Sequence, residues 1–267
     1  MLDKLNKHIK TKKPETTGEI TGKHPFYKND PLTSVLLTIF VFFVSQVGAG
    51  VLIALYPAIK NWTADQGANW ISTSFVAQFL YILLAETFAV WLILKLLKRA
   101  RVSKARIGLV KPKWENILYA LAGYGVYFVA YLFIVIIASH FSNLNVDQPQ
   151  ELGFDGAAGR QLVLVFASLV ILPPIAEEIM FRGFLFSSLR QKLRLRYAVI
   201  LTSLLFGIAH LQFGNGAPLL WVAALDTFTL SCVLSVMREK SGSLWPSIYL
   251  HVLKNGVAFI ALFHTKF

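Results

Sequence analysis

Long apolar runs, separated by short polar and basic segments, dominate the chain after its first thirty residues. They predict seven helices, at residues 32–59, 70–97, 115–139, 161–189, 197–212, 218–237 and 244–263. A helix needs about 20 apolar residues to span a bilayer, and most of these runs are long enough, with the fifth the shortest. The pattern therefore predicts an all-α fold, a polytopic bundle of transmembrane helices.

Composition supports lipid as the surroundings of this bundle. The 267 residues are 55% hydrophobic and only 15% charged, whereas soluble domains carry roughly 25% charged residues. The net charge of +12 does not indicate nucleic-acid binding, because the basic residues lie between apolar runs and leave no folded basic domain. The single cysteine, Cys232, excludes an intramolecular disulfide and a zinc site of the CxxC type.

The distribution of Lys and Arg predicts the orientation of the bundle. If the N-terminus is cytoplasmic, 21 of these residues fall on the cytoplasmic side and only Lys60, Arg160 and Lys266 fall outside. This bias predicts seven spans with the N-terminus in and the C-terminus out. We expect residues 1–31 to be a basic cytoplasmic tail, 32–104 to hold two helices and 105–267 to form a catalytic bundle in a bacterial plasma membrane.

Ionisable residues inside the apolar runs are the candidates for function. An ionisable group within a membrane is costly, so each is a functional hypothesis by default. The runs contain Glu86, Glu177, Glu178, Arg182, His210, Asp226, His251 and Lys254. We interpret Glu86 and Asp226 as hydrogen-bonded packing residues, either of which could line a cavity. Lys254 is expected to extend toward the membrane interface.

The densest of these groups follows two prolines. Pro173 and Pro174 predict a break in the fourth span. Glu177 and Glu178 then fall in the first turn of a new helix, near the positive end of its dipole. Glu178 and Arg182 have the i, i+4 spacing of an ion pair. Glu177 is rotated from this pair by about 100° and is left to act on water. The break predicts a polar pocket within the bilayer.

Two later segments add imidazole and amide groups. His210 stands near the end of the fifth run, and His251 and Asn255 lie one turn apart on one face of the seventh. Such a pair could bind an oxyanion, or it could be a hydrogen-bonding pair between helices. At 1.5 Å per residue, all of these groups fall in the middle or cytoplasmic half of the membrane.

Together these segments resemble the motifs of a known family. The CAAX protease and bacteriocin-processing (CPBP, Abi) family comprises intramembrane peptidases related to the Ras-converting CAAX endopeptidase. Its motifs are EExxxR, FxxxH and HxxxN, in that order. The corresponding residues here are Glu177-Glu178-xxx-Arg182, Phe206-xxx-His210 and His251-xxx-Asn255. The resemblance covers about residues 105–260.

The resemblance implies a role for each motif residue. Glu177 would be the catalytic glutamate and would activate water together with His210. His251 and Asn255 would stabilise the tetrahedral oxyanion, while Glu178 and its arginine partner would support the site. A glutamate base must hold a water within hydrogen-bond reach, and fixed donors can stabilise the transition state by roughly 3 kcal/mol each.

A metal-dependent version uses the same side chains. Glu177, His210, His251 and Asn255 could surround a zinc ion, but only Glu178 would then remain as a separate base. The motif HExxH is absent. We therefore favour a mechanism without metal and expect no cofactor.

The predicted function is that of an intramembrane endopeptidase. Its expected partners are membrane lipids and membrane-associated peptides or protein tails, with or without a lipid modification. One alternative is a non-catalytic immunity or scaffold protein of the same family. Another is a proton-coupled transporter, although the sequence contains no inverted repeat to support it.

Overall fold

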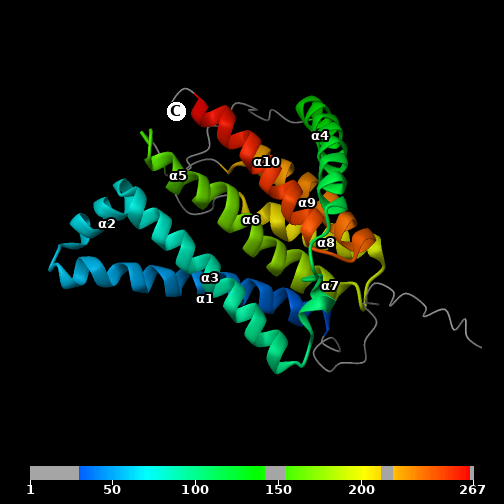
Figure 1. The fold of residues 1–267 in the computed structure, drawn as a ribbon, viewed down its shortest axis with the longest axis horizontal. Helices are drawn as coiled ribbons and strands as arrows, with labels where there is room; N and C mark the ends of the chain where they lie inside the picture. The colour runs from blue at the N-terminus through cyan, green and yellow to red at the C-terminus, as the bar shows by residue number, and fades with distance from the viewer. Residues whose placement is uncertain (1–29, 142–153, 155, 212–218, 265–267) are drawn as a thin grey trace, which may run out of the picture.

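The described part of the chain is helical. The computed structural model describes residues 30–141, 154, 156–211 and 219–264 (Figure 1). Five long helices within these ranges are α-helical throughout: α1 (Pro31–Ile59), α3 (Phe75–Arg99), α4 (Glu115–Phe141), α9 (Trp221–Ser241) and α10 (Trp245–Phe263). Shorter segments are α2 (Ala64–Thr73), the 3₁₀ helix η2 (Lys104–Ile107) and α8 (Leu195–Ala209).

A further long helix consists of α and π segments in succession. They are α5 (Gln161–Phe166), the π-helix η3 (Ala167–Ile171), α6 (Leu172–Glu177), the π-helix η4 (Glu178–Phe186) and α7 (Ser187–Leu189). The predicted break at Pro173 and Pro174 is wrong, because the backbone remains helical from Gln161 to Leu189. The prolines lie in the first turn of α6. They lack backbone N–H groups, and the helix continues past them with wider π turns on both sides. Glu177 and Glu178 are therefore not at a free helix N-terminus, and the predicted dipole stabilisation does not apply.

The bundle is that of an integral membrane protein. Six helices of the described residues are long and apolar enough to cross a membrane, and α8 is apolar but shorter. Large apolar side chains face outward from them, including Ile59, which is 77% exposed, and Val163, which is 70% exposed. A surface of this kind suits lipid rather than water. The prediction of an all-α, polytopic membrane bundle is confirmed.

One predicted helix has a different start. The run at 70–97 belongs to two helices, because α2 ends at Thr73 and α3 begins at Phe75. Ser74 separates them, and its hydroxyl accepts a hydrogen bond from the backbone N–H of Ala77, as an N-cap residue does. The other predicted helices agree with the structure to within a few residues. The predicted tail up to residue 29, the ends at Gln212 and Pro218, and Lys266 lie outside the described residues.

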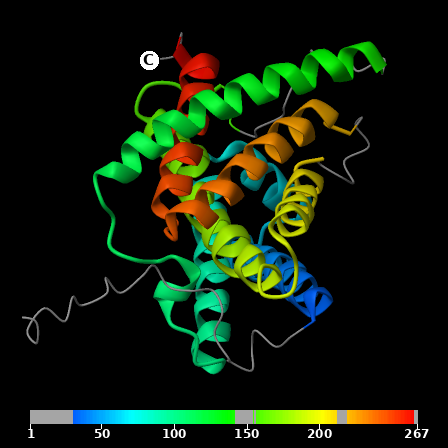
Figure 2. The same cartoon turned by 90° about the vertical axis from the view of Figure 1, so that its right-hand side faces the viewer.

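The helices pack around the segment η4. Helices α1 and α3 form one pair, α8 and α9 form another, and α4 covers α9 and α10 (Figure 1, Figure 2). All nine residues of η4 are buried. Helices α8 and α9 approach closely at Gly207, where a Cβ atom would lie only 2.9 Å from the carbonyl oxygen of Ala224. Small residues permit such contacts between membrane helices.

The connection between α3 and α4 is fastened to α9. The Arg238 side chain is 2% exposed, and its Nη2 donates a hydrogen bond of 3.0 Å to the carbonyl oxygen of Arg106. Gly108, which has φ of +87°, lies directly against this guanidinium, and a Cβ atom there would lie 2.7 Å from Nε. Only glycine fits both the backbone conformation and the space.

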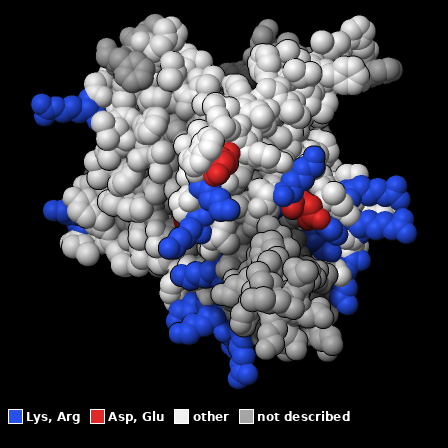
Figure 3. All heavy atoms as spheres, turned by 45° about the vertical axis from the view of Figure 1, so that its right-hand side comes forward, with Lys and Arg blue, Asp and Glu red and all other residues white. Residues whose placement is uncertain are grey.

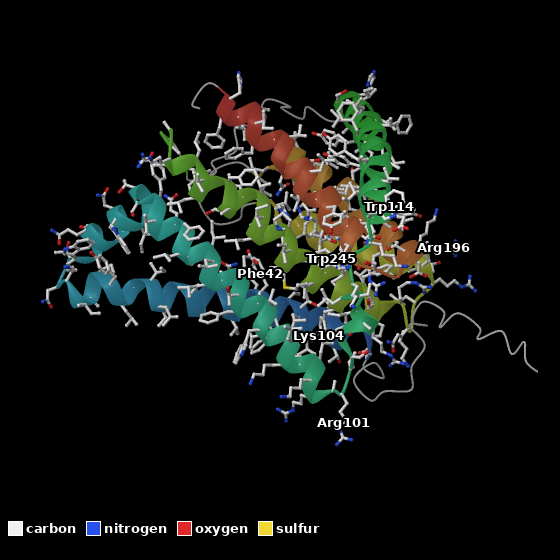
Figure 4. All side chains as sticks on the ribbon, viewed as in Figure 1. Phe42, Arg101, Lys104, Trp114, Arg196 and Trp245 are labelled. Atoms are coloured by element: carbon white, nitrogen blue, oxygen red, sulfur yellow. The ribbon has the colours of Figure 1, made fainter. Side chains whose placement is uncertain are left out.

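Basic side chains gather at one end of the bundle. Figure 3 shows most Lys and Arg side chains across the middle, lower and right-hand parts of this face, a few at its left edge, and a largely uncharged surface above. Arg101, Lys104 and Arg196 are among them, with Trp114 and Trp245 nearby (Figure 4). Tryptophan is typical of the membrane–water interface.

Candidate active site

A buried ion pair lies at the centre of the bundle. In η4, the Nη1 of Arg182 donates to Oε1 of Glu178 at 2.8 Å, and both side chains are 0% exposed. The guanidinium also lies 4.5 Å from the centre of the Phe206 ring. The ion pair expected from the i, i+4 spacing is therefore present, and it connects η4 with α8.

The same carboxylate holds a histidine from another helix. The Nδ1–H of His251 donates to Oε1 of Glu178 at 3.1 Å, so this oxygen serves both Arg182 and the imidazole. With Nδ1 bound in this way, the His251 Nε2 lies 3.7 Å from Oε2 of Glu177. Glu178 thus orients the ring, a contact between α10 and η4 that helix spacing could not predict.

Glu177 points in a different direction from Glu178. Neighbouring residues of a helix differ by about 100° in direction, and the Glu177 side chain is 21% exposed whereas that of Glu178 is fully buried. The carboxylate of Glu177 lines a cavity of about 240 Å³ between α6, α9 and α10. It is therefore the glutamate that a substrate or a water molecule can reach.

His210 faces this cavity from the end of α8. Its Nδ1–H donates to the carbonyl oxygen of Phe206 at 2.7 Å, because a carbonyl can only accept. In the neutral ring the other nitrogen, Nε2, is then a hydrogen-bond acceptor. His210 and Glu177 line the same cavity, so a basic nitrogen and a carboxylate from different helices are brought together.

Asn255 lies one turn beyond His251 on α10, and both line the cavity. One N–H of its carboxamide donates to the carbonyl oxygen of Leu169 at 2.9 Å. That carbonyl belongs to the π-helix η3 and is free to accept, because Pro173 and Pro174, four and five residues beyond it, carry no N–H. The structure therefore brings Glu177, His210, His251 and Asn255 to one cavity, with the Glu178–Arg182 pair packed behind them.

A second ion pair lies in the wall of this cavity. Lys254 Nζ of α10 is 2.7 Å from Oδ2 of Asp226 in α9, and the Tyr127 hydroxyl of α4 donates to the other oxygen of Asp226. The expectation that Lys254 extends toward the interface is wrong, because an anion of a neighbouring helix holds its ammonium group inside the protein. Asp226 is both a hydrogen-bonded packing residue and part of the cavity lining.

Glu177 and His210 also line a second, smaller cavity. It has a volume of about 90 Å³, and its far side includes Ser45 and Gln46 of α1 and Glu86 of α3. The sequence marked Glu86 as an ionisable residue within a span. Ser45 and Gln46 were missed, although polar residues inside an apolar run were the available signal.

The side chains do not fit the metal-dependent version. Within the described ranges, no three His, Cys, Asp or Glu side chains form a group that could hold a metal ion. The hydrogen bonds of the two histidines do not bear on this question, because each uses Nδ1 and leaves Nε2 toward the cavity. We derive no step through a metal.

A comparison with protein families finds a match over the region that contains this site. Residues 159–257 match the model described as type II CAAX prenyl endopeptidase Rce1-like. Through this region the chain is similar to the Rce1-like family. The Rce1-like region contains all four cavity residues that the motifs predicted, Glu177, His210, His251 and Asn255, and it includes most of the helices that build the larger cavity.

Bacterial proteins of curated collections are similar to this chain. "Putative membrane peptidase YdiL" of Bacillus subtilis (strain 168) is 26% identical over 74% of this chain and 73% of its own length. "Uncharacterized 24.3 kDa protein" of Escherichia coli is 34% identical over 34% of this chain, which spans 41% of that protein. "Uncharacterized protein YyaK" of B. subtilis (strain 168) is 28% identical over 58% of this chain and 50% of its own length. No solved structure matches the chain significantly.

Proposed function

We propose that this protein is an intramembrane endopeptidase that hydrolyses membrane-associated peptides or protein tails with a water molecule activated by Glu177. The observation that carries this proposal is the convergence of Glu177, His210, His251 and Asn255 on one cavity of about 240 Å³. Similarity to a CAAX-type endopeptidase family supports the same reaction. The cavity has both the acid–base groups and the donors that amide hydrolysis requires.

The first step is attack by water. A water molecule between Glu177 and His210 directs one O–H to the carboxylate and the other to Nε2 of His210. Glu177 removes a proton while the water oxygen forms a bond to the peptide carbonyl carbon, and the carbonyl electron pair moves onto oxygen. Because His210 Nδ1 is bound to a carbonyl, its Nε2 is the nitrogen available to orient the water.

The second step is collapse of the tetrahedral intermediate. The oxyanion accepts hydrogen bonds from the remaining N–H of Asn255 and from Nε2–H of His251 in its doubly protonated form. Each such donor is worth roughly 3 kcal/mol in acyl-transfer sites. The electron pair on oxygen re-forms the carbonyl, the C–N bond breaks, and the leaving nitrogen takes the proton from Glu177. The products are a carboxylic acid and an amine.

The Glu178–Arg182 pair has a supporting role in this scheme. Glu178 holds His251 through Nδ1, and Arg182 fixes the position of the same carboxylate oxygen. An orienting partner of this kind sets which histidine nitrogen faces the substrate. We expect changes at Glu178 to lower kcat through His251 without removing the nucleophilic water.

The proposal includes an orientation in the membrane. We infer seven spans, with α8 as the short one, the N-terminus in the cytoplasm and the C-terminus outside. The cluster of Lys and Arg at the end that carries Arg101 and Arg196 supports this assignment (Figure 4). The bacterial relatives favour a bacterial plasma membrane. Membrane lipids, and peptides with or without a lipid modification, are the proposed partners.

Cleavage of a peptide library by the purified protein in lipid nanodiscs tests the proposal. Wild type should cut at least one membrane-associated peptide, while Glu177→Gln and His210→Ala should each lower kcat by roughly 100-fold or more. Glu115→Gln is the control, because that carboxylate lies exposed at the start of α4 and should leave the rate unchanged. Cleavage that survives in Glu177→Gln would end the proposed mechanism, and a cellular role that survives without cleavage would favour a scaffold.

A further inference from the structure

The two cavities share Glu177 and His210 and are otherwise lined by different residues. Glu177 and His210 line the larger cavity together with α9 and α10. They also line the smaller one, which α1 and α3 close with Ser45, Gln46 and Glu86. The reactive pair is therefore accessible from both cavities, and only the larger one is also lined by His251 and Asn255.

The smaller cavity is suited to water rather than to a peptide. A cavity needs roughly 10–15 Å³ to hold a water molecule, which must find two to four polar partners. The volume of about 90 Å³ gives room for several, while a peptide segment would not fit. A carboxylate in an empty space within a membrane would be costly to bury, so the three polar groups Glu86, Glu177 and His210 favour a hydrated cavity.

The polar groups of α1 are already oriented for this role. The Tyr81 hydroxyl donates to Oε1 of Gln46 at 2.6 Å, so the amide N–H₂ of Gln46 remains as a donor. The Ser45 hydroxyl donates to the carbonyl oxygen of Phe42 at 2.8 Å, so its oxygen remains as an acceptor. Donors and acceptors are thus both present opposite Glu177.

Turnover requires a supply of water that the peptide does not block. Each hydrolysis consumes one water at Glu177, and a bound peptide would occupy the larger cavity. Water held in the space that Glu177 and His210 share with α1 and α3 would stay available while the peptide is bound. The smaller cavity is that space.

We propose that the smaller cavity is a water-binding site that supplies the hydrolytic water, and that Glu86 is the positioning residue that keeps it hydrated and aligns water against Glu177. The supply of hydrolytic water rests on the proposed function, whereas the binding of water does not. Residues of α1 and α3 lie outside the region that matches the family model. The proposed role of Glu86 therefore concerns a part of the chain that the family model does not cover.

The first test detects water without using activity. X-ray radiolysis of the wild-type protein in nanodiscs, made in H₂¹⁸O, generates hydroxyl radicals from bound water that oxidise adjacent side chains. Met180 lines the smaller cavity and should be labelled with ¹⁸O, whereas the fully buried Phe186, which lines neither cavity, should not. An unlabelled Met180 would overturn the proposal whether or not the protein cleaves peptides. Labelling of Met180 in a protein that cleaves no peptide would retain the water site and reject the proposed function.

The second test assigns the role of Glu86. Glu86→Leu should reduce Met180 labelling severalfold and lower kcat by roughly 10- to 100-fold, with KM nearly unchanged because the peptide cavity is untouched. Glu86→Gln, which retains hydrogen bonding, should restore much of both. Thr87→Val is the matched control, because the neighbouring Thr87 is exposed on the outer face of α3. A wild-type kcat in Glu86→Leu, or an effect on KM alone, would contradict the positioning role.

Discussion

Replacing Arg182 by methionine isolates a carboxylate in the centre of the bundle. The Arg182 and Glu178 side chains are both 0% exposed and are 2.8 Å apart, and removal of one partner from a buried pair costs about 3–5 kcal/mol. The guanidinium also lies 4.5 Å from the Phe206 ring, a contact worth up to about 2 kcal/mol when desolvated. We expect Arg182→Met to lower the free energy of unfolding by at least about 3 kcal/mol.

A double-mutant cycle separates the charge from the packing. Glu178→Gln removes the stranded charge but retains an oxygen for His251, so the double variant with Arg182→Met should recover most of the lost stability. The four proteins would be compared by equilibrium unfolding in mixed micelles titrated with SDS. If the double variant is as unstable as Arg182→Met alone, the loss comes from the packing of the guanidinium, and the reasoning from a stranded charge is refuted.

Four further predictions concern the glycines, the cavity wall and metal dependence. Gly108→Ala should lower the free energy of unfolding by about 1–3 kcal/mol, because φ is positive there and the new Cβ would clash with a buried guanidinium. The control is Gly125→Ala at an exposed position, which should be neutral or stabilising by up to about 1 kcal/mol. Thermal unfolding measures both. Gly207→Ala should force α8 away from α9 and lower both the melting temperature and peptide cleavage; unchanged cleavage would show that the close approach does not position the site. Lys254→Met should destabilise the protein more than the double change with Asp226→Asn, because the 2.7 Å ion pair loses only one partner in the single variant. Cleavage should persist in strong zinc chelators; if they abolish it and zinc alone restores it, the metal-free mechanism is wrong.

Hydropathy predicted the bundle because the bilayer imposes a simple rule on length and composition. It predicted the ends of α4 and α10 closely, where apolar runs meet polar residues. It placed the start of α3 wrongly, because a serine cap inside a continuous apolar pattern ends one helix and begins another. The prediction at the proline pair was also wrong, because a helix with π turns can continue past two residues that lack a backbone N–H.

The sequence predicted which residues form the candidate site, but it did not predict most of the contacts between them. The motifs pointed to Glu177, His210, His251 and Asn255, which line one cavity. Their convergence could not be read from spacing, because it depends on how α6, α8 and α10 pack. For the same reason the sequence did not predict that Glu178 would hold a histidine 73 residues away. Intramembrane charge was the useful signal, since it marked every ionisable residue of both cavities.

The π turns explain why the site forms in this helix. In η3 the widened turn presents the Leu169 carbonyl to Asn255, and η4, which begins at Glu178, directs that carboxylate into the core, where it meets Arg182 and the His251 ring. Between them, α6 ends on Glu177, whose side chain is left in the cavity wall. The Leu169 carbonyl has no partner within its own helix because Pro173 and Pro174, four and five residues beyond it, carry no N–H. The prolines therefore do not break the helix. They leave backbone groups without a partner in the helix, and such a group holds a side chain of a neighbouring helix.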